Sequence, residues 1–427
     1  GFVRTSASSA RLCQDAVDAV HAALGPPGQV ATLILPADVS WGEGAQPCAP
    51  PAVPAAPAAD DASVQAIAQL LRSGKKTALL LGGQALREPG LLAAARIAAQ
   101  AGVPLLAEVF PTRLTRGAGL PAVERIAYLA EMAGVQLADL DHLILVDAKA
   151  PVSFFAYPGK KSDLVPDGCS VHTLAAPEQD ALASLEKLCA ALGAQQAQPR
   201  LQAPLRPGRP TGRLTAPKVC KAVGHLLPEG AILIDEAITS GLMLGAMTAG
   251  CPRHDLITLT GGAIGQGLPN AVGAAIACPD RPVIALIGDG TAMYTIQALW
   301  TMAREQLNVT TIIFNNATYS VLNIEIERVG AVEAGPKAKS QLDISNPVID
   351  FARLAQGMGV HGVRVDNAED LAKAMEYALA HPGPHLIEAV VPESLNGVKR
   401  KVLPWVLRSL PSLPLSLTRA LKRKIAP

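Results

Sequence analysis

The sequence has no excess of either charge, no paired-cysteine motif and no apolar run long enough to cross a membrane. Its net charge is +1 over 427 residues, which argues against a general nucleic-acid-binding protein. The seven cysteines are scattered without a CxxC pair, so we expect neither a zinc site nor a disulfide framework. No stretch reads as a signal peptide, and we expect reduced thiols in a cytoplasmic protein.

Apolar residues are abundant, because 49% of the chain is hydrophobic and 17% is charged. This composition can fill sizeable cores in two or three domains. Apolar runs such as 77–81, 142–146 and 283–287 alternate with helical patterns along the chain. The alternation predicts an α/β fold with parallel sheets, whose near-continuous apolar strands are covered on both faces.

Changes in composition divide the chain into six parts. The first holds a helical pattern at 16–24 and a strand at 31–35, which together are too little for a domain, so we expect the end of a larger one. Two stretches rich in proline predict linkers. The expected parts are 1–46 (remnant of a domain), 47–59 (linker), 60–194 (central α/β domain), 195–217 (linker), 218–392 (third α/β domain) and 393–427 (basic tail).

The basic tail allows two interpretations. It contains one acid, Glu393, and the basic residues Lys399, Arg400, Lys401, Arg408, Arg419, Lys422, Arg423 and Lys424. An amphipathic segment that binds a membrane surface or a partner is one interpretation. We favour a poorly ordered tail, or one packed over the active site, because several prolines interrupt any long helix.

The stretch from Gly288 to Asn316 is the most informative. Gly288-Asp289-Gly290 follows one apolar run, and Asn315-Asn316 follows the next, twenty-four residues later. Two strand ends would therefore present a carboxylate and an amide side by side. Such oxygen ligands suit Mg²⁺, which keeps positions open for phosphate oxygens. The glycines would let the backbone approach a diphosphate at a helix N-terminus.

This arrangement resembles the thiamine-diphosphate (ThDP) signature, in which GDG is followed by NN at this spacing. The third domain looks like the pyrophosphate-binding domain of ThDP enzymes, 60–194 resembles their central domain, and 1–46 looks like the end of their pyrimidine-binding domain. Residues 288–300 and 315–319 are most similar to benzoylformate decarboxylases, and acetolactate synthase stays open as an alternative. The resemblance implies a ThDP- and Mg²⁺-dependent 2-oxo acid decarboxylase or carboligase.

The resemblance also implies roles for individual residues. Asp289 and Asn316 would bind Mg²⁺ through side chains, and Thr318 through its backbone carbonyl. Gly262 would accept a hydrogen bond from the cofactor's amino group, and Ile264 would hold the cofactor bent, unless it is plain core. The full cofactor-binding set is Thr239, Ser240, Gly262, Ile264, Gly288, Asp289, Gly290, Thr291, Asn316 and Tyr319.

Substrate and partners are less determined. We expect a small 2-oxo acid substrate, a homodimer or homotetramer, no nucleic acid and no FAD. The segment 150–157 lacks the histidine that benzoylformate decarboxylases carry there, which argues against benzoylformate. Val321, Leu322 and Ile324 predict an aliphatic contribution to the pocket wall. Tyr294 and Trp300 are expected to pack in the helix after the GDG motif.

The family's activating glutamate belongs to its pyrimidine-binding domain and would lie N-terminal to Gly1. We therefore assign no catalytic residue within these 427 residues. That leaves a second hypothesis, a non-catalytic or split-subunit chain that binds ThDP without turning over a substrate.

Overall fold

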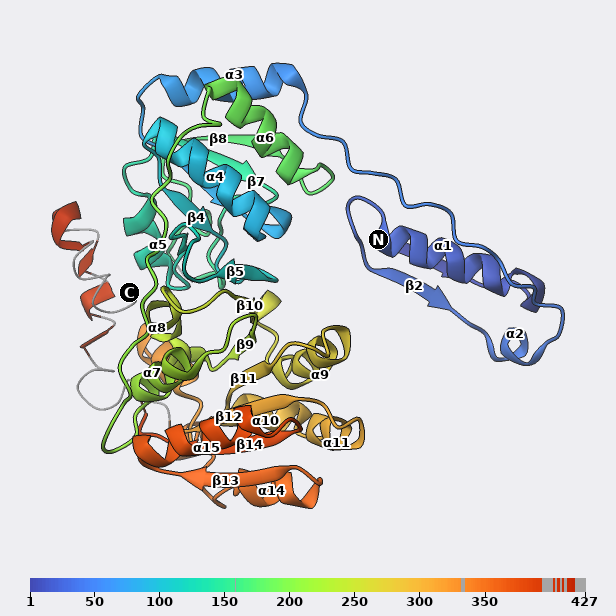
Figure 1. The fold of residues 1–427 in the computed structure, drawn as a ribbon, viewed down its shortest axis with the longest axis vertical. Helices are drawn as coiled ribbons and strands as arrows, with labels where there is room; N and C mark the ends of the chain where they lie inside the picture. Colours follow the sequence, from blue (N-terminus) through green and yellow to red (C-terminus); the bar gives the residue numbers. More distant parts are fainter. Residues whose placement is uncertain are drawn as a thin grey trace.

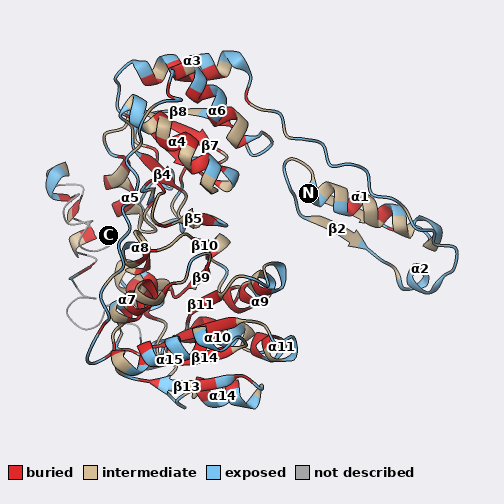
Figure 2. Cartoon of the chain, in the orientation of Figure 1, coloured by how far each residue is buried: buried red, intermediate tan, exposed pale blue. Residues whose placement is uncertain are grey.

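The computed structural model describes residues 1–157, 159–331, 335–393, 402–403, 405–407, 409–410 and 413–418. Two α/β domains stack on each other, and a small N-terminal unit lies apart from them (Figure 1). Buried residues concentrate in the strands and in the helix faces turned toward them (Figure 2). In the part of the chain so described, no helix is long and apolar enough to cross a membrane.

The N-terminal unit is a parallel strand pair with two helices. β1 (Phe2–Thr5) pairs with β2 (Ala31–Ile34), and α1 (Leu12–Leu24) and the short α2 (Ala37–Trp41) follow these strands. Its apolar side chains are largely uncovered, since Val30 is 81% and Trp41 88% exposed. Residues 42–60 then run without helix or strand to the next domain.

The second unit is a parallel sheet covered on both faces. Its strand order is β6-β4-β3-β7-β8. Leu79 and Leu81 pack under α3, α4 and α6, whereas Ala78 and Leu80 pack against α5. The elements are α3 (Asp61–Arg72), β3 (Thr77–Leu81), α4 (Glu88–Ala101), β4 (Leu105–Ala107), β6 (Glu124–Arg125), α5 (Ala130–Leu137), β7 (His142–Val146), β8 (Ser170–Ala175) and α6 (Ala181–Leu192).

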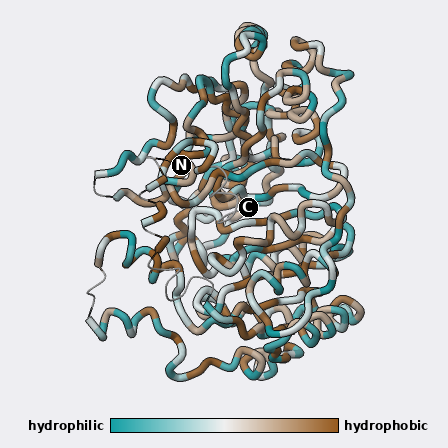
Figure 3. Tube along the Cα trace, turned by 90° about the vertical axis from the view of Figure 1, so that its left-hand side faces the viewer, coloured by the Kyte–Doolittle hydropathy of each residue, from teal (hydrophilic) through white to brown (hydrophobic). Residues whose placement is uncertain are grey.

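The third unit is a seven-stranded sheet in the order β13-β14-β12-β11-β9-β10-β5. One face packs on α7, α8 and α15, and the other on α9, α11 and α14. Figure 3 shows hydrophobic stretches, in brown, running through the interior of these domains. The elements are α7 (Ala216–Leu226), β9 (Ile232–Glu236), α8 (Leu244–Thr248), β10 (His254–Thr258), α9 (Gly267–Ala277), β11 (Val283–Gly288), α10 (Asp289–Thr295), α11 (Ala298–Arg304), β12 (Val309–Asn315), α12 (Ser320–Arg328), α13 (Pro336–Ser340), α14 (Phe351–Gly357), β13 (His361–Val365), α15 (Ala368–Ala380) and β14 (His385–Val390).

This sheet confirms the predicted α/β class, with one departure. The edge strand β5 (Leu114–Arg116) comes from the middle of the chain and pairs antiparallel with β10. Asp255 on β10 accepts hydrogen bonds from Arg113 and Arg281, both at 2.8 Å. The central region is therefore joined to the third sheet by a strand as well as by the connecting chain.

The described part of the tail packs onto the domains. Leu403, Leu407 and Leu410 are buried against Met132 of α5 and Ile324 of α12. The eight basic residues of the predicted tail lie outside the described residues. Leu403, Leu407 and Leu410 form a small core with α5 of the second unit and α12 of the third.

Candidate functional site

The predicted site residues come together at the carboxyl ends of four neighbouring strands. β12, β11, β9 and β10 are adjacent and parallel in the sheet, so the loops after them meet at one edge. Thr239 and Ser240 follow β9, Gly262 and Ile264 follow β10, and Asp289 follows β11. This edge is where ligands bind in open α/β sheets.

Asp289 is a buried acid at this edge. Asp289 is the first residue of α10 and is 3% exposed. Its side chain lies next to the loop that follows β12. One oxygen accepts a hydrogen bond from Gly290 N at 2.8 Å, and the other accepts from Asn316 N at 2.9 Å and Ala317 N at 2.6 Å. The two halves of the GDG and NN pattern therefore contact each other directly.

Burial raises the pKa of Asp289 to about 6, although its backbone donors oppose the shift. A divalent cation beside the carboxylate would reverse this penalty by stabilising the charged form. The buried hydroxyl of Ser320, in the first turn of α12, makes no hydrogen bond. Both observations fit a cation and phosphate oxygens at this edge.

The loop after β12 is held in an unusual backbone conformation. Ala317 has a φ of 59°, and Ile238 in the facing loop has a φ of 50°. Such left-handed values cost of order 1–3 kcal/mol for residues other than glycine and gather at ligand sites. Asn316 Oδ1 accepts from Thr318 N at 3.1 Å, and its amide lies 3.5 Å from Ser240 Oγ. The loop after β9 and the loop after β12 therefore meet at the side-chain amide of Asn316.

Gly290 has a requirement of its own. A Cβ added there would overlap the ring of Tyr319, whose hydroxyl lies 3.5 Å from Gly290 O. Thr291 is buried and donates to Gly288 O at 2.8 Å. The absence of a side chain at Gly290 thus lets the Tyr319 ring lie against the first turn of α10.

Glu236 is a site residue that the sequence reasoning missed. It ends β9 and is 1% exposed. Its carboxylate accepts hydrogen bonds from Gly265 N at 2.7 Å, Gln266 N at 3.1 Å and Gly267 N at 3.0 Å. It thereby fixes the turn that carries Gly262 and Ile264 and caps the start of α9. A buried acid at a strand end was visible in the sequence, but its partners were not.

Gly262 lies under an aromatic ring from the central domain. Its φ is 64°, and a Cβ added there would overlap Phe154. Ile264, two residues on, is neither buried nor fully exposed. Phe154 belongs to the segment 150–157, which was noted in the sequence for its lack of histidine. The structure therefore brings that segment to the predicted cofactor turn with a phenyl ring instead.

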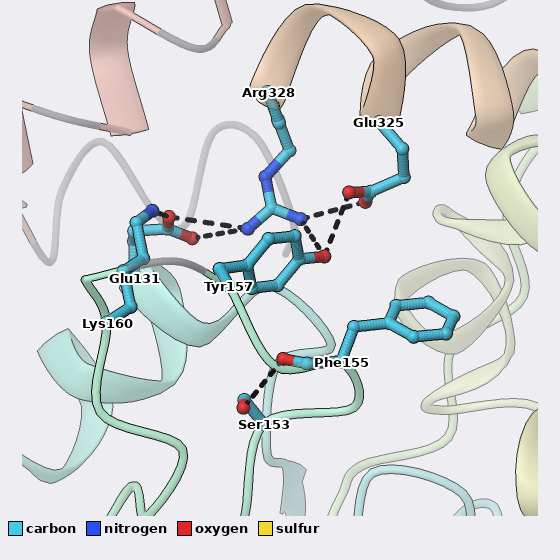
Figure 4. Close-up of polar contacts among 7 residues, drawn as sticks. All are labelled: Glu131, Ser153, Phe155, Tyr157, Lys160, Glu325 and Arg328. Atoms are coloured by element: carbon cyan, nitrogen blue, oxygen red, sulfur yellow. Dashed lines mark hydrogen bonds and ion pairs between the residues drawn. The ribbon is translucent and has the colours of Figure 1, made fainter. Parts of the chain in front are cut away.

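The same segment is anchored to α12, as Figure 4 shows. The hydroxyl of Tyr157 donates to Glu325 at 2.8 Å and accepts from Arg328 at 2.7 Å. Arg328 is 5% exposed, pairs with Glu131 on α5 at 3.0 Å, and stacks on the Tyr157 ring at 4.4 Å. Of the predicted pocket residues on α12, Leu322 is 44% exposed, whereas Ile324 is 6% exposed and packs away in the tail core.

Comparisons with known proteins agree with this geometry. Residues 242–389 match the family model described as "Thiamine pyrophosphate enzyme, C-terminal TPP binding domain". The chain is 53% identical over 404 residues to a putative acetolactate synthase large subunit IlvX of Mycobacterium tuberculosis, covering 93% of this chain and 76% of that protein. It is 35% identical over 177 residues to a benzoylformate decarboxylase of Pseudomonas aeruginosa, covering 42% of this chain and 32% of that protein.

A solved structure gives the same picture over a longer span. The thiamine diphosphate-dependent 4-hydroxybenzoylformate decarboxylase of Rhodococcus jostii superposes with a TM-score of 0.74 at 25% sequence identity. The superposition covers 92% of this chain and 76% of that one. Likeness therefore extends beyond the region matched by the family model.

Proposed function

Since the chain belongs to the thiamine-pyrophosphate enzyme family that includes acetolactate synthase large subunits and benzoylformate decarboxylases, we propose that it is a Mg²⁺-dependent 2-oxo acid decarboxylase and carboligase. The observation that carries the proposal is the direct contact of Asp289 with the Asn316 loop. When bound, ThDP supplies an electron sink that lets CO₂ leave a 2-oxo acid.

Each part of the cofactor has residues suited to it. Asp289, Asn316 and the Thr318 carbonyl would hold Mg²⁺, because carboxylate, amide and carbonyl oxygens are the ligands this ion prefers. Residues of the loops after β9, β11 and β12 would hold the diphosphate, and the turn after β10 would hold the aminopyrimidine. Those residues are Thr239, Ser240, Gly288, Gly290, Thr291 and Tyr319 for the diphosphate, and Gly262 and Ile264 for the aminopyrimidine.

FAD is not part of the proposal. In the central sheet, the turn after β3 is where a dinucleotide phosphate would approach the backbone. The carboxylate of Asp147 is placed there and accepts a hydrogen bond from Gln84 N at 2.7 Å. A fixed negative charge at this turn repels a pyrophosphate.

For assembly, we propose a homodimer or homotetramer. Helices α9, α10 and α11 expose apolar side chains on the outside of the third domain: Ile276 is 59%, Tyr294 58% and Trp300 53% exposed. The packing expected for Tyr294 and Trp300 is thus incomplete within one chain. A patch of this kind is typical of a symmetric interface. Light scattering coupled to gel filtration measures the mass.

The test of cofactor binding is Asp289→Asn, which keeps the shape of the side chain and removes its charge. We expect Mg²⁺-dependent ThDP affinity to fall about 100-fold or more, because a metal ligand is lost. The matched control is Asp280→Asn, an exposed acid in the turn before β11. Calorimetric titration of both variants with ThDP and Mg²⁺ decides the point, and wild-type affinity in Asp289→Asn contradicts the assignment.

The test of the reaction is a panel of 2-oxo acids with the whole protein, ThDP and Mg²⁺. CO₂ release and joined products are measured separately, so that decarboxylation and carboligation are distinguished. We expect CO₂ release that depends on both ThDP and Mg²⁺. Tight ThDP binding without turnover of any 2-oxo acid would instead support the non-catalytic hypothesis.

A further inference from the structure

Aromatic residues are scarce in this chain, yet several of them gather beside the turn after β10. This turn carries Gly262 and Ile264, and we call it the cofactor turn. Phe, Trp and Tyr make up 3% of the sequence. Phe154 lies at the centre of the group, with its ring centroid 5.7 Å from Phe110, 5.5 Å from Tyr128 and 5.1 Å from Phe155. We call these four residues the aromatic wall. Such a concentration in an aromatic-poor chain calls for a reason other than core filling.

The aromatic wall is not buried as a core would be. Phe154 is 38% and Phe155 50% exposed, although both rings are apolar. Phe154 lies directly against Gly262, where an added Cβ would overlap it. The exposed faces therefore adjoin the turn to which the cofactor's aminopyrimidine is assigned. Half-covered rings beside a reactive centre are typical of ligand sites, which are mostly apolar with a few polar groups.

The aromatic wall is also held firmly in place. Ser153 Oγ donates to Phe155 O at 2.9 Å, and Ser153 N donates to Ser162 O at 2.7 Å. Two residues beyond Phe155, the phenol of Tyr157 is fixed between Glu325 and Arg328 (Figure 4). Anchoring of the backbone on either side of the rings limits their displacement, which lets a binding surface select by shape.

We propose that the aromatic wall recognises the substrate and that the 2-oxo acid bears an aromatic ring on its carbonyl carbon. Aromatic faces bind flat apolar groups in offset or edge-to-face contacts. The methyl group of pyruvate would leave most of that surface in contact with water. This inference rests on the proposed function and names its substrate class, and it reverses the sequence-based argument against benzoylformate.

The first test compares benzoylformate with pyruvate on the whole protein with ThDP and Mg²⁺. We expect kcat/KM for benzoylformate to exceed that for pyruvate by about 100-fold or more, since several ring contacts act together. In Phe155→Ala and in Phe154→Leu the ratio should fall about 10-fold. Val152→Ala is the matched control, because this side chain is 62% exposed in the same segment and outside the aromatic wall. Its ratio should match the wild type.

A second readout needs no turnover. Mandelate and lactate are the reduced, unreactive counterparts of the two substrates, and calorimetry measures their binding to the protein loaded with ThDP and Mg²⁺. We expect mandelate to bind at least about 10-fold more tightly than lactate, and Phe155→Ala to lower that preference.

The two readouts separate failure of the inference from failure of the proposed function. A preference for pyruvate overturns the proposed role of the aromatic wall, and so does a benzoylformate-to-pyruvate ratio of kcat/KM that neither phenylalanine variant changes. CO₂ release would in that case still support the proposed function. If no 2-oxo acid releases CO₂, the function fails and binding decides the inference. A mandelate preference that Phe155→Ala reduces then supports the aromatic wall, and equal affinities overturn it.

Discussion

Replacing Glu236 with glutamine tests how the cofactor turn is held. The substitution keeps the shape and one acceptor oxygen but places an NH₂ group against one of three backbone donors. Hydrogen bonds to a charged group contribute about 1.5–3 kcal/mol each, and an orphaned buried N–H costs about 1–3 kcal/mol. Burial raises the pKa of Glu236, so the cost of burying the carboxylate offsets part of this contribution. We expect a net loss of about 2 kcal/mol in the free energy of unfolding.

The same substitution should weaken ThDP binding. Because the carboxylate fixes the turn that carries Gly262 and Ile264, we expect affinity to fall roughly tenfold, as for groups that orient a ligand's direct contacts. Urea unfolding without ThDP gives the stability change, and calorimetric titration with ThDP and Mg²⁺ gives the affinity. Glu229→Gln is the control, because this exposed glutamate lies just before the same strand. Wild-type stability together with wild-type affinity in Glu236→Gln would refute the reasoning.

Two further predictions concern the glycine turn and a buried histidine. Gly290→Ala should reduce ThDP affinity at least tenfold because the methyl group displaces the Tyr319 ring, whereas Gly273→Ala, which meets open space on α9, should not; titration with ThDP distinguishes them. Burial lowers the pKa of His254 to about 4. Between pH 6.5 and about pH 4, the unfolded chain therefore binds a proton at this histidine that the folded chain does not bind. Stability should therefore fall by about 3 kcal/mol as pH drops through this window. In His254→Gln the pH dependence measured by urea unfolding should be flatter by that amount, and an identical slope would contradict the shift.

The parts of the site that follow single strands were predictable from sequence. Asp289 and Asn316 each come directly after a buried apolar run, so parallel pairing of those runs was enough to bring them together. The cores behind them were predictable for the same reason, because near-continuous apolar strands require helices on both faces. Local pattern thus determines both the α/β fold and the place of the proposed metal ligands.

The missed features depend on contacts between distant segments. Phe154 meets Gly262 only when the central and third domains are packed together, and no local pattern encodes that meeting. Glu236 finds its three donors in a turn about thirty residues away. The left-handed backbone of Ala317 is equally invisible, because alanine carries no sign of it as glycine would. Tertiary contact, rather than propensity, selects these residues.

The strand β5 has a consequence for how the chain folds. Its pairing of Leu114 with Leu256 joins positions about 140 residues apart, and non-local pairing of this kind slows folding. During synthesis, the hydrogen-bonding edge of β5 stays unpaired until β10 has been made. An unpaired strand edge can pair with other chains. Chimeras that exchange the central region with that of a relative should therefore keep 114–116 matched to the recipient's third sheet.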